Sequence, residues 1–335
     1  MKKFKATYIV IGIFILLAVY IYFFERGEVP SKKIKIFSDI KKEDINKIEL
    51  NNVEKNETII CEKIRDNEWQ IISPKRYDIE QDEIDSLVNN FVNLDIDREF
   101  KDKELRNLKD YGLDAPSFKA IAYFKNGKSA TLFFGQKTPS NSYYFVQPSD
   151  KNVVCTAATY SVENVKKDIP KLRKKSIFLF DTEKVTKILL AGDKGPIECE
   201  KDDKGDWRVK STVSVPGDKN AIESIVNTVK NSRIQEFIED EPKDLGKYGL
   251  KKSKISIKIW EGKDKVIASL LFGKKMEGKE QVYVKNESAK PVYAVFSSIA
   301  TDVHKGIDDL KDKKIEEKPK STTKGNGGTI GTIKK

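Results

Sequence analysis

Histidine is nearly absent from this 335-residue chain, which has a single one, His304. One histidine allows no metal site with two histidine ligands, and it leaves the first half of the chain without the most frequent general base. The sequence also lacks a Gly-x-Gly-x-x-Gly loop, a complete phosphate-binding loop and a Gly-x-Ser-x-Gly turn. The sequence therefore predicts no catalytic residues, no metal ligands and no cofactor.

Cysteine is scarce as well, with three residues in the whole chain. Three cysteines do not build a disulfide framework. Cys61 and Cys199 occupy equivalent positions of an internal repeat described below, so we expect each in a core of its own. We interpret the cysteines as small buried apolar residues and predict no redox or metal chemistry for them.

Long apolar runs are limited to one segment, residues 8–24, which holds 17 residues without a charge. At about 1.5 Å per residue this segment is roughly 25 Å long, close to the thickness of a bilayer core. Aromatic residues lie at both of its ends, and Lys2, Lys3 and Lys5 precede it. Because positive flanks stay in the cytoplasm, we expect residues 1–7 inside and the rest of the chain outside the cytoplasmic membrane.

A cleaved signal peptide is the alternative interpretation of this segment. Its basic start fits, but residues 8–24 are longer than the usual apolar core of about 7–15 residues, and no small-x-small cleavage site follows. The sequence therefore favours an uncleaved single-pass anchor, followed by a linker over residues 25–38.

The formal net charge of +11 is concentrated at the two ends of the chain. Residues 1–24 carry three lysines and no acid, and residues 311–335 carry eight lysines and three acids. The remaining residues have both signs interspersed, so no basic stripe for nucleic acid is predicted. Residues 316–335 are lysine-rich and poor in apolar side chains, and we expect them to be disordered.

The rest of the sequence contains an internal repeat with two copies. Trp69 recurs as Trp207, 138 residues later. Other matches at an offset of 137 or 138 residues are Cys61-Glu62-Lys63 with Cys199-Glu200-Lys201, Tyr111-Gly112-Leu113 with Tyr248-Gly249-Leu250, and Leu132–Gly135 with Leu270–Gly273. This period has the length of a domain rather than of a solenoid repeat. We predict two tandem domains, over residues 39–177 and 178–315.

Each copy has the sequence pattern of an α+β domain. Short apolar runs before and around the tryptophan predict an antiparallel meander, and four more strands are predicted after residue 117. Between them, Ile84, Leu87, Val88 and Phe91 share the i, i+3, i+4, i+7 spacing of one helix face, and the second copy repeats this spacing. Asp82 and its counterpart Asn220 are the predicted N-caps of the two helices. The fold class is thus α+β, with antiparallel sheets, few helices and one preceding transmembrane helix.

A repeated Leu-x-x-Tyr-Gly-Leu element is interpreted as a structural corner, with glycine at a sharp turn. A tyrosine-rich strand follows, and we expect alternation to bury at least one of its aromatic side chains. The residues of this signature are also weak candidates for partner contact: Tyr111, Gly112, Leu113, Gly135, Tyr143, Tyr144, Tyr248, Gly249, Leu250, Gly273 and Tyr283.

The signature residues carry a resemblance to a known family. The segments Tyr111–Pro116, Leu132–Pro139, Tyr143-Tyr144 and Val153-Val154 together resemble the bacterial domain-of-unknown-function 4340 family, and the second copy resembles it less closely, with Lys251 where aspartate is usual. The resemblance implies a bacterial membrane protein with an N-terminal anchor and no assigned activity. It also implies association with ABC-type export systems. The family supplies no catalytic residues.

Three functions are compatible with the sequence. The first is a non-enzymatic accessory or interaction module of the cell envelope, with another membrane or envelope protein as its partner. The second is a protein that binds a small ligand in a cleft between the two copies. The third is a hydrolase of envelope polymers that uses a pair of carboxylates. The absence of a recognisable acid/base pair favours the first.

Overall fold

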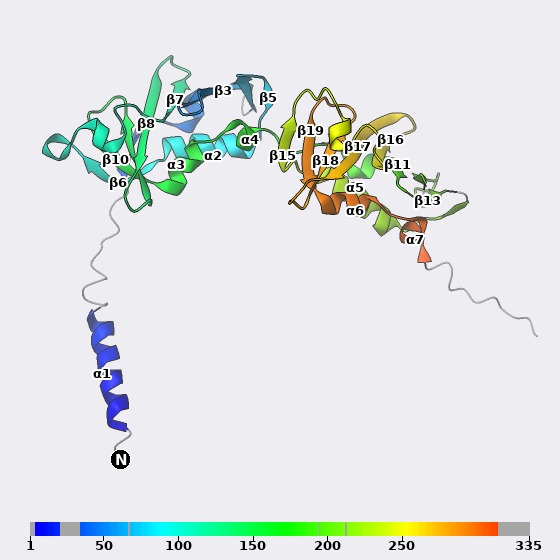
Figure 1. The fold of residues 1–335 in the computed structure, drawn as a ribbon, viewed down its shortest axis with the longest axis horizontal. Coiled ribbons are helices and arrows are strands. Elements are labelled where there is room, and N and C mark those ends of the chain that lie inside the picture. Colours follow the sequence, from blue (N-terminus) through cyan, green and yellow to red (C-terminus); the bar gives the residue numbers. More distant parts are fainter. Residues whose placement is uncertain (1–3, 21–33, 66–67, 194, 212, 314–335) are drawn as a thin grey trace, which may run out of the picture. The chain divides into compact units, whose positions relative to one another are not determined.

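The protein is described here by a computed structural model, which covers residues 4–20, 34–65, 68–193, 195–211 and 213–313 (Figure 1). Part of the predicted linker, residues 21–24 of the predicted anchor and the predicted disordered tail lie outside these described residues. The chain divides into two compact units, residues 1–174 and 175–335. Each unit is described by itself.

The first helix, α1 (Phe4–Tyr20), has 17 residues and covers most of the predicted anchor. Its apolar side chains from Val10 to Tyr20 are mostly exposed, with Phe14 and Leu16 exposed by 72% and 70%. Within the described residues, no helix has both the length and the hydropathy required to cross a membrane. The transmembrane part of the predicted fold is therefore not found in the structure.

Unit 1 contains a ten-stranded antiparallel sheet with the order β1-β6-β10-β9-β8-β7-β2-β3-β4-β5. Its strands are β1 (Ile34–Lys35), β2 (Ile45–Asn52), β3 (Glu57–Arg65), β4 (Glu68–Ser73), β5 (Tyr77–Asp78), β6 (Asp95–Phe100), β7 (Phe118–Phe124), β8 (Ser129–Lys137), β9 (Tyr143–Pro148) and β10 (Val154–Ala158). Its helices are α2 (Gln81–Val92), α3 (Thr159–Val165), α4 (Ile169–Leu172) and the short 3₁₀ turns Lys42–Asp44, Asp102–Glu104 and Leu108–Tyr111.

Unit 2 repeats this plan in a nine-stranded antiparallel sheet with the order β14-β13-β12-β11-β16-β17-β18-β19-β15. Its strands are β11 (Val185–Ala191), β12 (Ile197–Lys201), β13 (Trp207–Lys210), β14 (Ser214–Pro216), β15 (Glu236–Glu239), β16 (Ile255–Glu261), β17 (Lys265–Lys275), β18 (Gln281–Asn286) and β19 (Val292–Phe296). Its helices are α5 (Lys219–Lys230), α6 (Ser297–Val303), α7 (Ile307–Leu310) and the 3₁₀ turns Thr182–Lys184 and Gly246–Tyr248. The predicted α+β class with tandem antiparallel sheets is confirmed.

The helix predicted in each copy forms as its apolar spacing requires. In α2, the side chains of Ile84, Leu87, Val88 and Phe91 are all buried, because residues spaced in this way lie on one helix face. The predicted N-caps were wrong by two residues: α2 is preceded by Glu80 and α5 by Asp218. The Asp218 carboxylate accepts from the backbone amides of Asn220 and Ala221, so the cap of α5 is an aspartate two positions earlier than expected.

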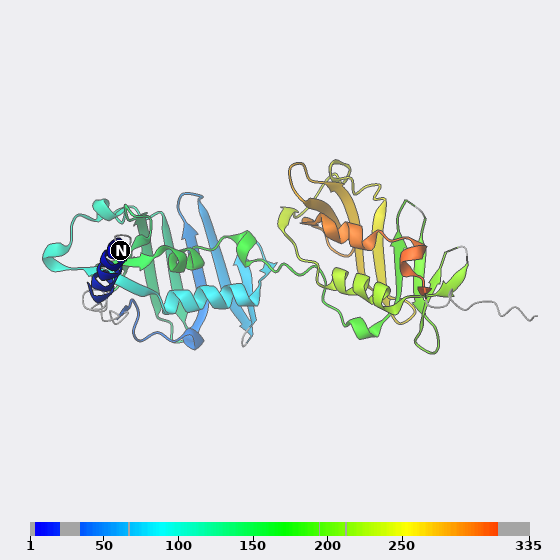
Figure 2. The same ribbon diagram turned by 90° about the horizontal axis from the view of Figure 1, so that it is seen from below.

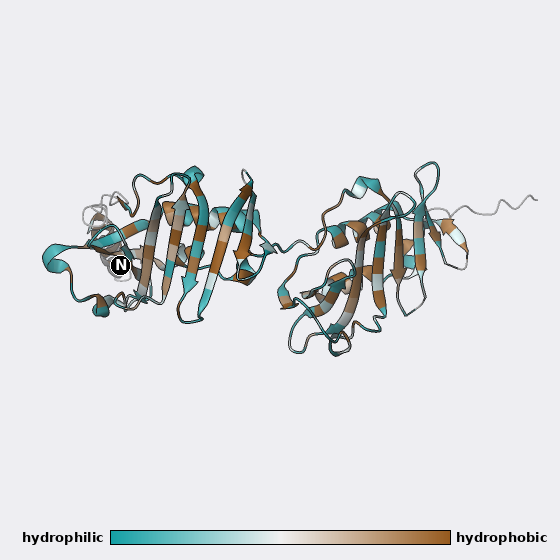
Figure 3. Cartoon of the chain, turned by 90° about the horizontal axis from the view of Figure 1, so that it is seen from above, coloured by the Kyte–Doolittle hydropathy of each residue, from teal (hydrophilic) through white to brown (hydrophobic). Residues whose placement is uncertain are grey.

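Each sheet has two differently covered faces. The helices of a unit pack on one face, where the main core lies, and this arrangement is visible for both units in Figure 2. Hydrophobic and hydrophilic residues alternate along the strands, as Figure 3 shows. The opposite face carries a smaller apolar cluster, which in unit 1 contains Tyr111, Leu113 and Val154 and in unit 2 contains Tyr248, Leu250 and Val292. The Tyr-Gly-Leu corner of each copy therefore belongs to the face that the helices leave open.

Candidate functional site

The Tyr-Gly-Leu signature forms a tight corner in both units. Gly112 and Gly249 have φ angles of +67° and +73°, in the left-handed region that favours glycine. The corner lies directly against the strand that carries the second glycine of the signature. A Cβ atom on Gly135 would lie 2.2 Å from the carbonyl oxygen of Tyr111, and one on Gly273 would lie 2.1 Å from that of Tyr248. Both glycines of each copy are thus required by backbone geometry.

Behind the corner, the tyrosine and leucine close the smaller apolar cluster. The ring centroid of Tyr111 lies 4.9 Å from that of Phe145 and 5.8 Å from that of Phe100. In unit 2, Tyr283 takes the place of Phe145, with its ring centroid 5.0 Å from that of Tyr248. Aromatic pairs at these separations contribute about 1 kcal/mol beyond their burial. Tyr111, Leu113, Tyr248 and Leu250 are all buried and present little surface to a partner.

The tyrosine-rich strand β9 divides its side chains between the two faces of the sheet. Tyr144 is buried in the main core, and its hydroxyl donates to the Glu163 carboxylate at 2.6 Å. Burial, followed by this neighbouring carboxylate, raises the pKa of Tyr144 far above its usual range. Tyr143 is only partly buried and belongs to the alternate set of side chains. The two tyrosines therefore do not form a joint aromatic platform.

Unit 1 has a pocket with a volume of about 760 Å³ at its signature corner. We name this pocket the corner pocket. Its lining residues come from β6, the following loop, the corner, the end of β8, the loop after β8 and β9: Arg98, Phe100, Lys103, Glu104, Arg106, Asp110, Tyr111, Gln136, Lys137, Pro139 and Phe145. Four of these side chains are cationic and two are anionic. The corner pocket is thus a basic opening beside an aromatic wall.

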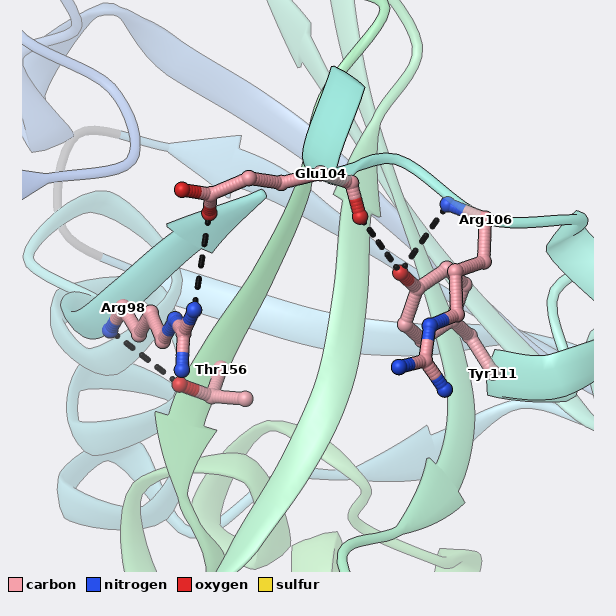
Figure 4. Close-up of polar contacts among 5 residues, drawn as sticks. All are labelled: Arg98, Glu104, Arg106, Tyr111 and Thr156. Atoms are coloured by element: carbon pink, nitrogen blue, oxygen red, sulfur yellow. Dashed lines mark hydrogen bonds and ion pairs between the residues drawn. The ribbon is translucent and has the colours of Figure 1, made fainter. Parts of the chain in front are cut away.

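The loop between β6 and the corner is fastened by the Tyr111 hydroxyl. This hydroxyl accepts from the backbone amide of Arg106 at 3.2 Å and donates to the backbone carbonyl of Glu104 at 3.4 Å (Figure 4). On β6, the backbone amide of Arg98 donates to Thr156 Oγ1 at 3.1 Å. The guanidinium of Arg98 lies over the ring of Phe100, 4.6 Å from its centroid. The basic side chains are therefore attached to backbone that is held in place.

The cations of the corner pocket are weakly compensated within the chain. Arg98 pairs with Glu104 at 3.5 Å, but both side chains are 61% exposed, and exposed pairs of this kind contribute about 0–1 kcal/mol. In the described parts of the chain, the side chains of Lys103 and Arg106 form no ion pair. Lys137 lies 5.2 Å from the ring centroid of Tyr144. An incoming anion would therefore meet available positive charge.

The same place in unit 2 has the opposite character. Arg98 pairs in register with Thr156 on β10, and the equivalent pairing on β19 places Glu236 opposite Ala294. Glu236 is itself bound by Lys279 at 2.6 Å. The substitution of a glutamate for Arg98 removes the cationic edge of the pocket from this copy.

Unit 2 also pairs the charges of its corner internally. The Glu239 carboxylate accepts from Lys247 Nζ at 2.7 Å and from the Tyr248 hydroxyl at 2.5 Å. These hydrogen bonds, that of Lys247 first, hold the pKa of Glu239 below its usual range. The loop before the corner, residues 239–244, carries four acids and one lysine, whereas its counterpart, residues 101–107, carries three cations and two acids. The two copies have diverged most clearly in charge at this corner.

A second pair of pockets flanks the repeated tryptophans. A pocket of about 350 Å³ in unit 1 is lined by Trp69, Asp78, Glu80 and residues next to them. A pocket of about 540 Å³ in unit 2 is lined by Trp207, Pro216, Asp218 and residues next to them. Each tryptophan ring also lies 5.2 Å from the Nζ atom of a cross-strand lysine, Lys63 or Lys201. Both tryptophans are almost fully buried, which makes them part of the cores rather than binding surfaces.

Residues with other chemistry are not assembled into a site. Within the described ranges, no three histidine, cysteine, aspartate or glutamate side chains are grouped so as to hold a metal ion. The three cysteines are free and buried, and burial raises the pKa of each thiol to about 12. His304 is exposed and follows the last turn of α6.

The basic residues of the corner pocket were missed by sequence reasoning. Arg98, Arg106 and Lys137 are separated in sequence, and β6 was not predicted, since four of its six residues are charged. The comparison of the two copies contained a usable signal, because it aligns the basic residues 101–107 with the acidic residues 239–244.

The chain matches the sequence model of the family described as "Domain of unknown function (DUF4340)" twice, over residues 69–213 and 207–323. The tandem membership predicted from the signature residues is confirmed. No curated protein and no solved structure matches the chain.

Proposed function

The chain belongs to the DUF4340 family, whose name assigns no activity, and from that premise we propose that it is a membrane-anchored, non-enzymatic binding module of the cell envelope. The observation that carries the proposal is the corner pocket, where Lys103 and Arg106 have no ionic partner among the described residues while the same corner of unit 2 is internally paired. We infer from this difference in charge pairing that unit 1 is the binding unit and that unit 2 supports it.

The proposed anchor is residues 8–24. It is supported by the charge-free sequence, by the lysines that precede it and by the exposed apolar side chains of α1. In this orientation the chain after residue 26 is extracytoplasmic. Extraction of cell membranes with alkaline carbonate tests the anchor: the full chain stays with the membrane, and a variant without residues 8–24 is released.

The four carboxyls whose pKa is shifted are unsuited to act as the general acid of a hydrolase. A general acid requires a carboxyl whose pKa is raised. Four described carboxyls have a pKa below the usual range, and the first cause is in each case a hydrogen bond from a lysine or serine: Glu200, Glu239, Glu280 and Glu287. These carboxylates are held in the ionised form, which suits surface ion pairs and not proton donation.

The proposed partner is another membrane or envelope protein. The association with ABC-type export systems that the family resemblance implies supplies the class of that partner, and the module would present its corner pocket beside the transporter. Nucleic acid is not a proposed partner, since the charges of both units are of mixed sign.

Site-directed photo-crosslinking in living cells tests the accessory role. A photoreactive residue replaces Lys103 at the rim of the corner pocket or, as the matched control, exposed Lys263 on the β16–β17 hairpin of unit 2. We expect a specific permease or envelope component to be captured from position 103 and not from position 263. Capture of the same background proteins from both positions would contradict the proposal.

A further inference from the structure

The corner pocket gathers cations from separate segments of unit 1 at one opening. Arg98 is on β6, Lys103 and Arg106 are on the loop that follows, and Lys137 ends β8. Like charges that are brought together repel one another, and a bound anion relieves this repulsion. The arrangement therefore favours an anionic ligand over a neutral or cationic one.

One wall of the same pocket is aromatic. Phe100, Tyr111 and Phe145 line it, with ring centroids 4.9–6.2 Å apart. Pockets that combine a mostly apolar wall with a few placed charges bind molecules with a polar head and a less polar body. A free inorganic ion would leave the aromatic wall without a contact.

We infer that the corner pocket binds a phosphate group carried by a larger molecule; the inference rests on the proposed binding function and names its ligand class. A guanidinium fork grips phosphate oxygens in pairs, and a lysine adds a point charge. The tetrahedral phosphate offers oxygens in several directions, which suits a pocket lined by Arg98, Arg106 and Lys103 from separate segments. A planar carboxylate offers two oxygens and is satisfied by a single fork.

The guanidinium of Arg98 is already positioned to bind such a ligand. Its guanidinium lies over the Phe100 ring, 4.6 Å from the centroid, and its partner Glu104 is 3.5 Å away in an exposed pair. Exchange of Glu104 for a phosphate replaces a weak ion pair by a charge-assisted one. Arg106 needs no exchange, because no described acid binds its side chain.

The experiment uses the full chain in a non-ionic detergent, and titration calorimetry measures the dissociation constant for each probe. The probes are sn-glycerol 3-phosphate, micelles doped with phosphatidylglycerol, sodium acetate as the carboxylate control, and an octaglutamate peptide. We expect one of the phosphate probes to bind at least about tenfold more tightly than acetate and the peptide, equivalent to about 1.4 kcal/mol.

Two substitutions with the same loss of charge connect the binding to the pocket. Arg106→Gln removes the guanidinium and keeps the backbone amide that donates to Tyr111, so the loop keeps its fastening. Lys109→Gln removes an exposed charge on the neighbouring turn, outside the pocket lining. We expect Arg106→Gln to weaken phosphate binding at least tenfold and Lys109→Gln to change it less than twofold, with the melting temperature of both variants unchanged.

Each outcome decides one question. Tight binding of glycerol phosphate alone supports a soluble or polymeric phosphate ligand, and tight binding of the doped micelles alone supports a lipid headgroup. Equal binding of acetate, tighter binding of octaglutamate, or equal effects of the two substitutions would overturn the inference. If phosphate fails to bind while crosslinking from position 103 captures a transporter, the proposed function stands and only the ligand class is wrong.

Discussion

Substitution of Gly135 by alanine tests the close approach between the corner and β8 directly. The added Cβ would lie 2.2 Å from the Tyr111 carbonyl oxygen and 3.0 Å from a carbon of Leu113. Carbon and oxygen atoms approach to about 3.3 Å in favourable contacts, so the corner must retreat by roughly 1 Å. Gly135 has no positive φ angle, and therefore the clash is the whole perturbation.

The expected loss of stability follows from the contacts that the corner makes. Overpacking of a well-packed site costs typically about 1–3 kcal/mol. Retreat of the corner also uncovers part of Tyr111 and Leu113, which are each 5% exposed, and full exposure of a leucine costs about 1.5–3 kcal/mol. We therefore expect Gly135→Ala to destabilise unit 1 by about 3 kcal/mol. For a domain of this size that lowers its melting temperature by roughly 10 °C.

Thermal unfolding of the full chain in non-ionic detergent, followed by tryptophan fluorescence, measures the effect. Each unit has its own core, with Trp69 in unit 1 and Trp207 and Trp260 in unit 2, so a chain in which the tryptophans of one unit are replaced by phenylalanine reports the transition of the other unit. Gly135→Ala should move the unit 1 transition only. The twin substitution Gly273→Ala, with its Cβ 2.1 Å from the Tyr248 carbonyl oxygen, should move the unit 2 transition only.

A glycine without neighbours provides the control. Gly127 occupies a hairpin turn at φ +78°, where nothing lies within 4 Å of an added Cβ atom, and asparagine tolerates this backbone region. Gly127→Asn should change the stability by less than about 0.5 kcal/mol. If Gly135→Ala is as mild as this control, the tight contact between corner and strand is absent and the structural role of the signature glycines is refuted.

Three further outcomes are expected. The pKa of the Glu239 carboxyl is lower in the folded chain than in the unfolded chain, so its contribution to stability is present above about pH 4.5 and is lost as the pH falls through the folded value. The difference in melting temperature between Glu239→Gln and the native chain should therefore shrink between pH 5 and pH 3. Since all three thiols are buried, Ellman's reagent should detect almost none at pH 8 before unfolding and three after it in denaturant. Leu250→Ala should destabilise unit 2 by about 2–4 kcal/mol, while Val266→Ala, at a side chain 47% exposed, should change it by less than about 0.5 kcal/mol in urea unfolding.

The parts of the fold that were predictable are those in which the apolar pattern alone sets the structure. The helix face of Ile84, Leu87, Val88 and Phe91 is buried as predicted, because its spacing allows no other shared surface. The glycine of the corner was also predictable, since an αL turn leaves glycine as the favoured residue. Gly135 shows the limit of this reasoning. Its requirement comes from a carbonyl more than twenty positions earlier in the chain, which only the folded structure brings near.

The corner pocket was outside the reach of single-sequence reasoning for a different reason. Strand β6, which is second from the edge of the sheet, has the sequence Asp-Ile-Asp-Arg-Glu-Phe, where charge hides the alternation that identifies buried strands. The short strand β1 pairs only with Asp95 and Ile96 of β6, and the next two side chains, Asp97 and Arg98, are exposed to solvent, where charge is tolerated. Arg98 thus resembled a loop residue, and nothing in the sequence linked it to Lys137, which is on a strand separated from β6 by β10 and β9 and lines the same pocket.

The family matches are out of phase with the folding units. The first match runs from Trp69 to residue 213, across the division between residues 174 and 175, so it omits β2 and β3 and includes their equivalents β11 and β12 from the next unit. In the sheet of unit 1, β2 and β3 lie between β7 and β4. A fragment cut at the family boundary would therefore split one sheet into two pieces with new open edges, which invites aggregation. A fragment that keeps the sheet of unit 1 whole therefore begins near Ile34 and not at Trp69.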